Sequence, residues 1–314
     1  RYADPANPGP TYADYIRFMP IEDPAYTMAA TAGPQPLARG TAERRQVPLT
    51  VANDTDAPRS REPVVSGIPI PKGDLSGPEH ARLLNGSGTA TPCHITSTGN
   101  WPDGSVKWLL LDFQASIKSR ASTTFALEYG NAVAAVPAVA GLSIIREGDR
   151  LRVDTGPASF EFAPNVGRPL TATLRGATTP ALLLEGIIAA ADGRRWSLSA
   201  ARDTTVVVEE ESPFRVVVRL RGRLAGKNGP GPIAFDHRIR LFAGRAEALI
   251  EYGFVPTAAE DTIPLRLIRV HLGGATAGAA EFVPNAGKPV SVAVADGPRL
   301  LQTGESHYGS QGGF

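Results

Sequence analysis

The sequence has one cysteine, no long apolar run and almost no net charge, and each shortage excludes a class of protein. Cys93 has no partner for a disulfide within the chain, and no Cys/His cluster has zinc spacing, so we expect neither a metal nor another cofactor. No run of 18 apolar residues is present, so we expect no membrane partner. A net charge of +1 offers no electrostatic attraction for nucleic acid.

What is present is typical of a globular chain rich in turns. The 314 residues are 42% hydrophobic and 20% charged, and 33 glycines and 28 prolines make up about a fifth of them. The length suffices for two domains with a real core. The chain starts at Arg1 rather than at methionine, which we interpret as processing or trimming. The sequence leaves the compartment open, with a secreted or extracellular location favoured over a cytoplasmic one.

Residues 1–45 differ from the rest of the chain. They contain seven prolines without sustained periodicity, together with four of the seven tyrosines. Disordered tails are normally poor in aromatic residues, so we interpret this segment as an extended arm. The arm is expected to dock on the same chain, on a missing domain or on a neighbouring subunit, which makes self-association a possible partner interaction. The alternative is a flexible terminus.

From Val47 onward the pattern predicts short β-strands and almost no helix. Alternating or apolar runs recur between turn signals such as Glu147-Gly148-Asp149 and Lys227-Asn228-Gly229-Pro230. The best helical candidate, residues 78–84, is barely two turns long. This density of strands predicts an all-β fold that ends in an antiparallel sandwich. The expected segments are 46–130, an uncharged linker at 131–141, a sandwich at 142–300 and a Gly-rich C-terminal segment at 301–314.

One ten-residue stretch occurs twice in the sandwich segment. Glu161-Phe162-Ala163-Pro164-Asn165-Val166-Gly167-Arg168-Pro169-Leu170 returns as Glu281-Phe282-Val283-Pro284-Asn285-Ala286-Gly287-Lys288-Pro289-Val290. Each copy places a Pro-Asn-x-Gly turn between apolar ends. Either the two hairpins are structurally equivalent, or one favourable turn has arisen twice.

Two of the three tryptophans bracket a turn at Trp101-Pro102-Asp103-Gly104-Ser105-Val106-Lys107-Trp108, and Leu109-Leu110-Leu111-Asp112-Phe113 follows at once. Proline presets φ and glycine accepts a positive φ, so we predict a hairpin corner with Trp108 packed inward. Together with Gly67-Ile68-Pro69-Ile70-Pro71-Lys72-Gly73, this stretch resembles the exo-rhamnogalacturonan lyase/YetA-like family.

The resemblance implies a small RIFT-type β-barrel at 46–130, followed by a β-sandwich. In that family a large α/α toroid comes next, whereas this chain stops at Phe314. The implied function is therefore the N-terminal two-domain portion of a polysaccharide-lyase-like protein that acts on or binds acidic, pectin-type polysaccharide. Whether the chain is an enzyme stays open, because the main catalytic domain is expected to be missing and no catalytic residue carries over.

Two other classes of function remain open. Barrel-plus-sandwich units also recur in filaments and virions, so the chain could be a non-catalytic assembly subunit whose arm contacts neighbours. A carbohydrate-binding module is the third possibility.

β-Elimination from a uronic acid requires a cation for the carboxylate, a base and an acid. Alternation over 236–240 places Asp236, Arg238 and Arg240 on one face of a predicted strand and His237 on the other. Such a polar face either holds an acidic sugar or is a solvated face with cross-strand ion pairs.

Further candidates lie nearer the C-terminus. Arg269 and His271 share a face of a later predicted strand, and Tyr252 lies on a strand between the two. His307 and Tyr308 stand between glycines, which suits either ligand approach or a flexible end. The candidate substrate-binding residues are Arg238, Arg240 and Arg269, and the candidate catalytic residues are His237, Tyr252, His271, His307 and Tyr308.

Overall fold

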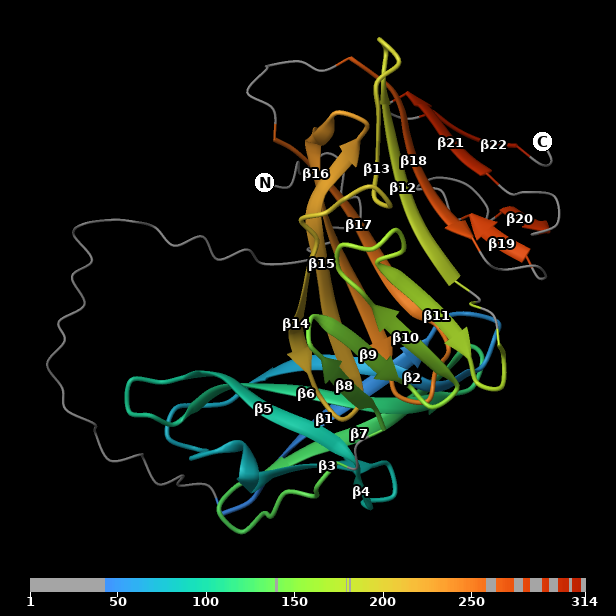
Figure 1. The fold of residues 1–314 in the computed structure, drawn as a ribbon. Helices are drawn as coiled ribbons and strands as arrows, with labels where there is room; N and C mark the ends of the chain where they lie inside the picture. Colours follow the sequence, from blue (N-terminus) through green and yellow to red (C-terminus); the bar gives the residue numbers. More distant parts are fainter. Residues whose placement is uncertain are drawn as a thin grey trace, which may run out of the picture. The chain divides into compact units, whose positions relative to one another are not determined.

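The computed structural model describes residues 43–138, 141–178, 180, 182–257, 264–273, 279–282, 290–293, 299–304 and 307–311. All of them fall within one compact unit, and nearly all regular structure is antiparallel β-sheet (Figure 1). Apart from its last three residues, the predicted arm lies outside the described residues.

The first β segment is a small barrel made of two sheets. One sheet has the strand order β1-β7-β3-β4 and the other β2-β6-β5. Apolar side chains from both sheets meet in a single core, which includes Leu83, Leu111, Phe113 and Leu127. The strands are β1 Arg45–Asn53, β2 Arg59–Pro69, β3 Ala81–Asn85, β4 Ala90–Thr91, β5 Cys93–Asn100, β6 Val106–Ile117 and β7 Ala121–Tyr129.

The helix predicted over 78–84 is wrong beyond its first turn. A 3₁₀ helix covers Pro78–His80, and β3 follows at once. Gly77 at its N-cap offers no side-chain hydrogen bond, so nothing favours extension of the helix. Leu83 is fully buried opposite Leu127 of β7, and this sheet pairing outweighs the weak local helix preference.

The corner at residues 101–108 is a tight turn, but its tryptophans are arranged differently from the prediction. Trp108 is 42% exposed, not packed inward. The β5–β6 pairing shifts register at Gly99, and such an irregularity leaves Lys107 and Trp108 both outside before alternation resumes at the buried Leu109. Trp101 fixes the corner instead, because its Nε1 donates to the Ile70 carbonyl at 3.0 Å.

The stretch expected as a linker lies against the barrel over its described residues. Val133 is 3% exposed. The Ala132 and Ala135 amides donate to the carbonyls of Glu43 and Glu79, and the Val133 carbonyl accepts from His80 Nδ1. Residues 131–138 are therefore a strap that completes the barrel.

The second β segment is built on one large antiparallel sheet. Its strand order is β17-β16-β15-β13-β12-β11-β10-β9-β8, with β14 beside β15 and β18 beside β12. Strands from both ends of this order bury side chains in one core, among them Val153, Phe160, Leu220 and Ile239. The sheet therefore folds over on itself into the two layers of a sandwich.

The strands of this segment are β8 Ser143–Glu147, β9 Arg150–Asp154, β10 Ala158–Phe162, β11 Leu170–Leu174, β12 Leu182–Ala190, β13 Arg195–Ser197, β14 Thr205–Glu211, β15 Arg215–Gly226, β16 Gly229–Phe242, β17 Ala248–Pro256 and β18 Leu265–Gly273. Two hairpins follow, β19 Ala279–Phe282 with β20 Val290–Ala293, and β21 Arg299–Gly304 with β22 His307–Gln311.

The two copies of the repeated stretch both form hairpins with the same pairing. Phe162 lies opposite Leu170 in the first copy, and Phe282 lies opposite Val290 in the second. The strand ends are therefore equivalent, while residues 283–289 of the second turn lie outside the described residues. The end of the chain, predicted as a Gly-rich segment, includes hairpin β21–β22.

Candidate functional site

A buried carboxylate marks the place where barrel and sandwich meet. On β6, Leu111 and Phe113 face the barrel core, so alternation turns Asp112 to the outer face of its sheet. Asp112 is nevertheless only 2% exposed. Residues 210–215, at the β14–β15 connection of the sandwich, cover it.

The covering segment holds Asp112 with one hydroxyl and one guanidinium group. Ser212 Oγ donates to Asp112 Oδ2 at 2.6 Å, and Arg215 Nε lies 3.5 Å from the same oxygen. Arg215 also pairs with Glu210 at 2.6 Å. The Ser212 hydroxyl accepts from the amides of Phe214 and Arg215, which fixes the turn that carries it.

This arrangement leaves two buried polar atoms without a hydrogen bond, namely Asp112 Oδ1 and Arg215 Nε. Both residues line a cavity of about 200 Å³. Its walls are His94, Thr96, Leu110, Asp112, Glu210, Glu211, Ser212 and Arg215. The two unpaired atoms themselves are inaccessible to solvent, and the side chains in the cavity walls include hydroxyl, imidazole and carboxylate groups.

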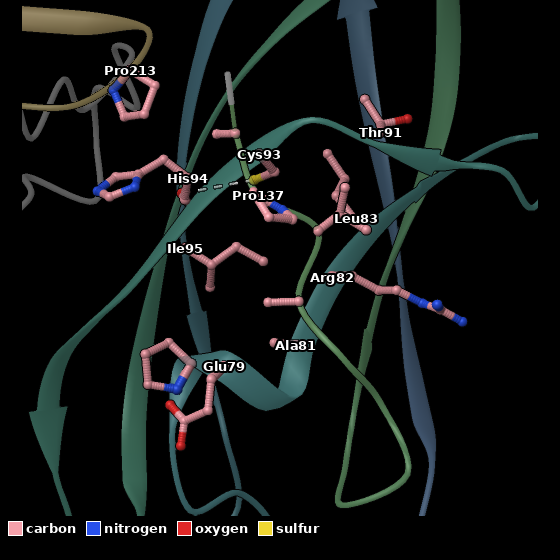
Figure 2. Close-up of a pocket in the computed structure, with 14 residues that line it drawn as sticks. Glu79, Ala81, Arg82, Leu83, Thr91, Cys93, His94, Ile95, Pro137 and Pro213 are labelled. Carbon is pink, nitrogen blue, oxygen red and sulfur yellow. Dashed lines mark hydrogen bonds between the residues drawn. The ribbon is translucent and has the colours of Figure 1, made fainter. Parts of the chain in front are cut away.

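A second cavity, of about 270 Å³, also has His94 in its wall and is largely apolar. It lies between strands β3 and β5 and the strap, and His94 and Pro213 stand at one end of it (Figure 2). The Cys93 thiol in this wall donates to the His94 carbonyl. Burial raises the pKa of Cys93 to about 12, so the thiol stays protonated at neutral pH and is a poor nucleophile.

The predicted polar face on residues 236–240 exists, and its charges pair with one another. Burial alternates along β16 as expected. Arg238 donates to both carboxylate oxygens of Glu209, at 2.7 and 3.2 Å. Arg240 lies 2.6 Å from Glu251, and Asp236 pairs with Arg219. An acidic ligand on this face would have to displace these carboxylates from the arginines.

His237 and Tyr252 stack inside the sandwich, not at a surface. Their ring centroids are 3.7 Å apart, and His237 is fully buried. The Gly253 amide donates to His237 Nδ1 at 3.3 Å, so the proton of the neutral ring resides on Nε2. Burial lowers the pKa of His237 to about 4 and raises that of Tyr252. The pair is an uncharged part of the core at neutral pH.

The remaining predicted residues lie on strands farther along the chain. Arg269 and His271 are both exposed on β18, opposite Ile187 and Glu185 of β12. His307 and Tyr308 lie on β22, and their side chains are outside the described part of the structure. The predicted candidates therefore do not converge on one cleft within the residues described.

The residues at the junction were missed from the sequence, although one signal pointed to them. Asp112 interrupts the apolar run from Leu109 to Phe113, and a lone carboxylate in such a run needs a specific partner when buried. Its partners Ser212 and Arg215 are about a hundred residues away in the chain, and no local pattern links them to it.

The described residues also bear on two other kinds of site. No helix there is long and apolar enough to cross a membrane. In the same part of the chain, no group of three or more His, Cys, Asp or Glu side chains could hold a metal ion.

Fold and cavity together define an all-β protein in which a small barrel precedes an antiparallel sandwich and a polar pocket lies where they meet. Residues 46–128, the segment that forms the barrel, match the family described as PcRGLX-like N-terminal RIFT barrel domain. The match confirms the resemblance read from residues 67–73 and 101–113.

Comparisons with curated proteins and with solved structures give two further results. No curated protein matches the sequence. Among solved structures, an alpha-mannosidase from Enterococcus faecalis V583 is similar with a TM-score of 0.49 and 13% identity, over 66% of this chain and 29% of that one. The chain therefore spans less than a third of the length of that protein.

Proposed function

We propose that this chain is the N-terminal barrel-and-sandwich portion of a carbohydrate-active protein of the polysaccharide-lyase type, which acts on or binds acidic, pectin-type polysaccharide. The observation that carries the proposal is the RIFT barrel at residues 46–128, which belongs to a PcRGLX-like family. A polymer of this kind is outside the cell, so an extracellular setting goes with the proposal.

The charges of the described residues suggest where an acidic chain would bind. Arg238 and Arg240 are already held by Glu209 and Glu251. Arg269 is exposed on β18 and, within the described part of the chain, has no ion-pair partner. A free guanidinium can form a bidentate pair with a uronate. Arg269, with His271 two residues farther on the same face, is therefore the better contact.

Binding of the whole chain to de-esterified pectin and to a neutral galactan, measured by affinity electrophoresis, tests the proposal. We expect retardation by pectin alone, and a several-fold weaker retardation for Arg269→Gln because one charge-assisted pair is lost. Arg120→Gln is the matched control, because that exposed arginine pairs with Asp56 on the barrel. Equal behaviour in both gels would contradict the proposal.

Catalysis is tested separately by incubating the chain with rhamnogalacturonan and following the ultraviolet absorbance of an unsaturated product. Product formation by the 314-residue chain would show that it carries the lyase activity itself. Binding without product supports a binding role in which chemistry needs further protein.

A further inference from the structure

We propose that the tryptophan corner, formed by Trp101, Lys107 and Trp108, is a binding site for one uronate unit of an acidic polysaccharide. The site rests on the proposed carbohydrate function and gives that function a contact on the barrel. Two exposed side chains at the start of β6 carry it, the indole of Trp108 and the ammonium group of Lys107.

The Trp108 indole lies on an open part of the outer face of sheet β2-β6-β5. The residue is 42% exposed, so much of a large apolar ring faces solvent. Its cross-strand neighbours are Pro69 on β2 and Gly99 on β5. An added Cβ at Gly99 would contact the Trp108 ring at 3.8 Å, and one at Gly67 of β2 would meet no described atom within 4 Å. The surface around the indole is therefore low and accessible.

The Lys107 ammonium is held at this corner without a carboxylate partner. Its Nζ lies 4.8 Å from the centroid of the Trp101 ring, a cation–π contact that restrains a long side chain. Among the described residues it forms no ion pair. An anionic ligand therefore pairs with Lys107 without displacing a protein carboxylate, which it would have to do at Arg238 or Arg240.

The carboxylate of the turn itself, Asp103, is already engaged. The Ser105 amide and hydroxyl both donate to Asp103 Oδ1, at 3.0 and 2.6 Å. These hydrogen bonds hold the pKa of Asp103 below its usual range, and the positive charge of Lys72 acts in the same direction. The turn therefore has two lysines, Lys72 and Lys107, for one carboxylate, and this balance favours an anion.

A hexuronate unit offers partners to both exposed groups. One face of a galacturonate ring carries the C–H bonds of C3, C4 and C5, and these hydrogens pack against the electron-rich face of an indole. The C6 carboxylate projects from C5, at the edge of that face. The α-carbons of Lys107 and Trp108 are about 3.8 Å apart, so the ammonium reaches the carboxylate of a ring stacked on Trp108. A neutral sugar would use the indole alone.

The outer face of β6 changes character toward the sandwich. Alternation places Trp108, Leu110 and Asp112 in one row, and the sandwich segment that covers Asp112 begins beyond Leu110. Glu210 and Glu211 line the cavity there. Their negative charge repels a further uronate, so we expect an acidic chain to extend from Trp108 away from the junction.

Titration of the full 314-residue chain with trigalacturonate and with its fully methyl-esterified form, followed by ligand-observed NMR, tests the site. The two probes share their rings and linkages and differ in the charge at C6. We expect a Kd on the order of 1 mM for the free acid and about tenfold weaker binding of the ester, which lacks the charge-assisted pair. Saturation transfer should be strongest at the protons on C3, C4 and C5.

Two variants separate stacking from charge. Trp108→Ala should weaken both probes about tenfold, whereas Lys107→Gln should weaken the acid about five- to tenfold and leave the ester unaltered. Lys107→Arg should bind the acid like the parent chain. Lys118→Gln and Val65→Ala are matched controls, because they alter an exposed lysine and an exposed valine elsewhere on the barrel. All these side chains are exposed, so the thermal transition should persist in each variant.

Trimer binding that Trp108→Ala leaves intact would overturn the site, and so would a preference for the acid that survives Lys107→Gln. A concentration-dependent dimer that Trp108→Ala dissociates, without trimer binding, would mean that a second copy of the chain covers the indole. Equal retardation of the parent and both variants by pectin would refute the tryptophan corner and leave the proposed function standing. A parent chain that binds neither pectin nor the trimer would refute both.

Discussion

His237 was a candidate catalytic residue in the sequence, but in the structure it is a packed residue of the sandwich core. Alternation places it beside Ile239, on the inner face of β16. There it stacks between Phe235 and Tyr252, with ring centroids 5.1 and 3.7 Å away. Its Nε2–H is buried without a hydrogen bond, and a second proton would have to go on Nδ1, which accepts from the Gly253 amide, so the charged ring would have no compensating partner.

This burial predicts a specific acid sensitivity. The pKa of His237 is about 4 in the folded chain and about 6.5 in an unfolded one. Between these values the unfolded state binds more protons, so the free energy of unfolding falls as the pH is lowered from about 6.5 to about 4. The full effect of this group is roughly 3 kcal/mol.

Denaturant unfolding of His237→Phe across the same pH range measures this contribution. The variant should lack that part of the pH dependence, whatever its stability at neutral pH. His271→Gln, at an exposed position, should keep the parent slope. If His237→Phe and the parent chain lose stability in parallel on acidification, the buried neutral histidine is not the cause.

At the scale of single elements, Gly231 on β16 occupies a strand position that has no room for a side chain. The indole of Trp196 lies against its α-carbon, and an added Cβ would overlap that ring. Trp196 is 8% exposed and belongs to the sandwich core. The close contact therefore depends on the absence of a side chain at residue 231.

Gly231→Ala should lower the free energy of unfolding by about 1–3 kcal/mol, because the tryptophan must shift within a packed core. Gly67→Ala is the matched strand control, since an added methyl there meets no atom within 4 Å. The control should leave the free energy of unfolding unchanged or raise it by up to about 1 kcal/mol. Urea titrations followed by tryptophan fluorescence compare the two, and equal effects would refute the packing argument.

The strands were largely predictable from the sequence, and the failures have physical reasons. Alternation along 236–240 is a local property, so the placement of His237 and Arg238 on opposite faces followed from it. Trp108 did not follow, because a register shift at Gly99 interrupts the alternation. The junction site could not be predicted from the sequence for another reason. Asp112 is buried because Ser212 and Arg215 cover it, and only the tertiary fold brings these residues close to it.

On the scale of the whole molecule, barrel and sandwich are joined by polar contacts. Arg245 Nη1 lies 3.1 Å from Glu62 Oε2 and donates to the Ser60 carbonyl. Gln114 Nε2 donates to the Ala243 carbonyl at 2.7 Å. Together with the cover over Asp112, these contacts hold the two parts in one arrangement, and we expect them to unfold in a single transition.

Arg245→Gln removes a charged donor from this junction. We expect it to lower the free energy of unfolding by about 1–3 kcal/mol and to broaden or split the calorimetric transition. Arg194→Gln is the control, because Arg194 pairs with Asp192 two residues away within the sandwich. Identical thermograms for the two variants would mean that the junction does not couple the parts.

The strap at residues 131–138 determines how far a fragment must extend to contain the complete barrel. The family match ends at residue 128, yet Val133 is buried against the barrel and Ala135 is hydrogen-bonded to Glu79. A fragment that stops at residue 128 would expose an apolar seam and lose a wall of the larger cavity. The transferable module, in a laboratory chimera or in gene fusion, therefore extends to about residue 138.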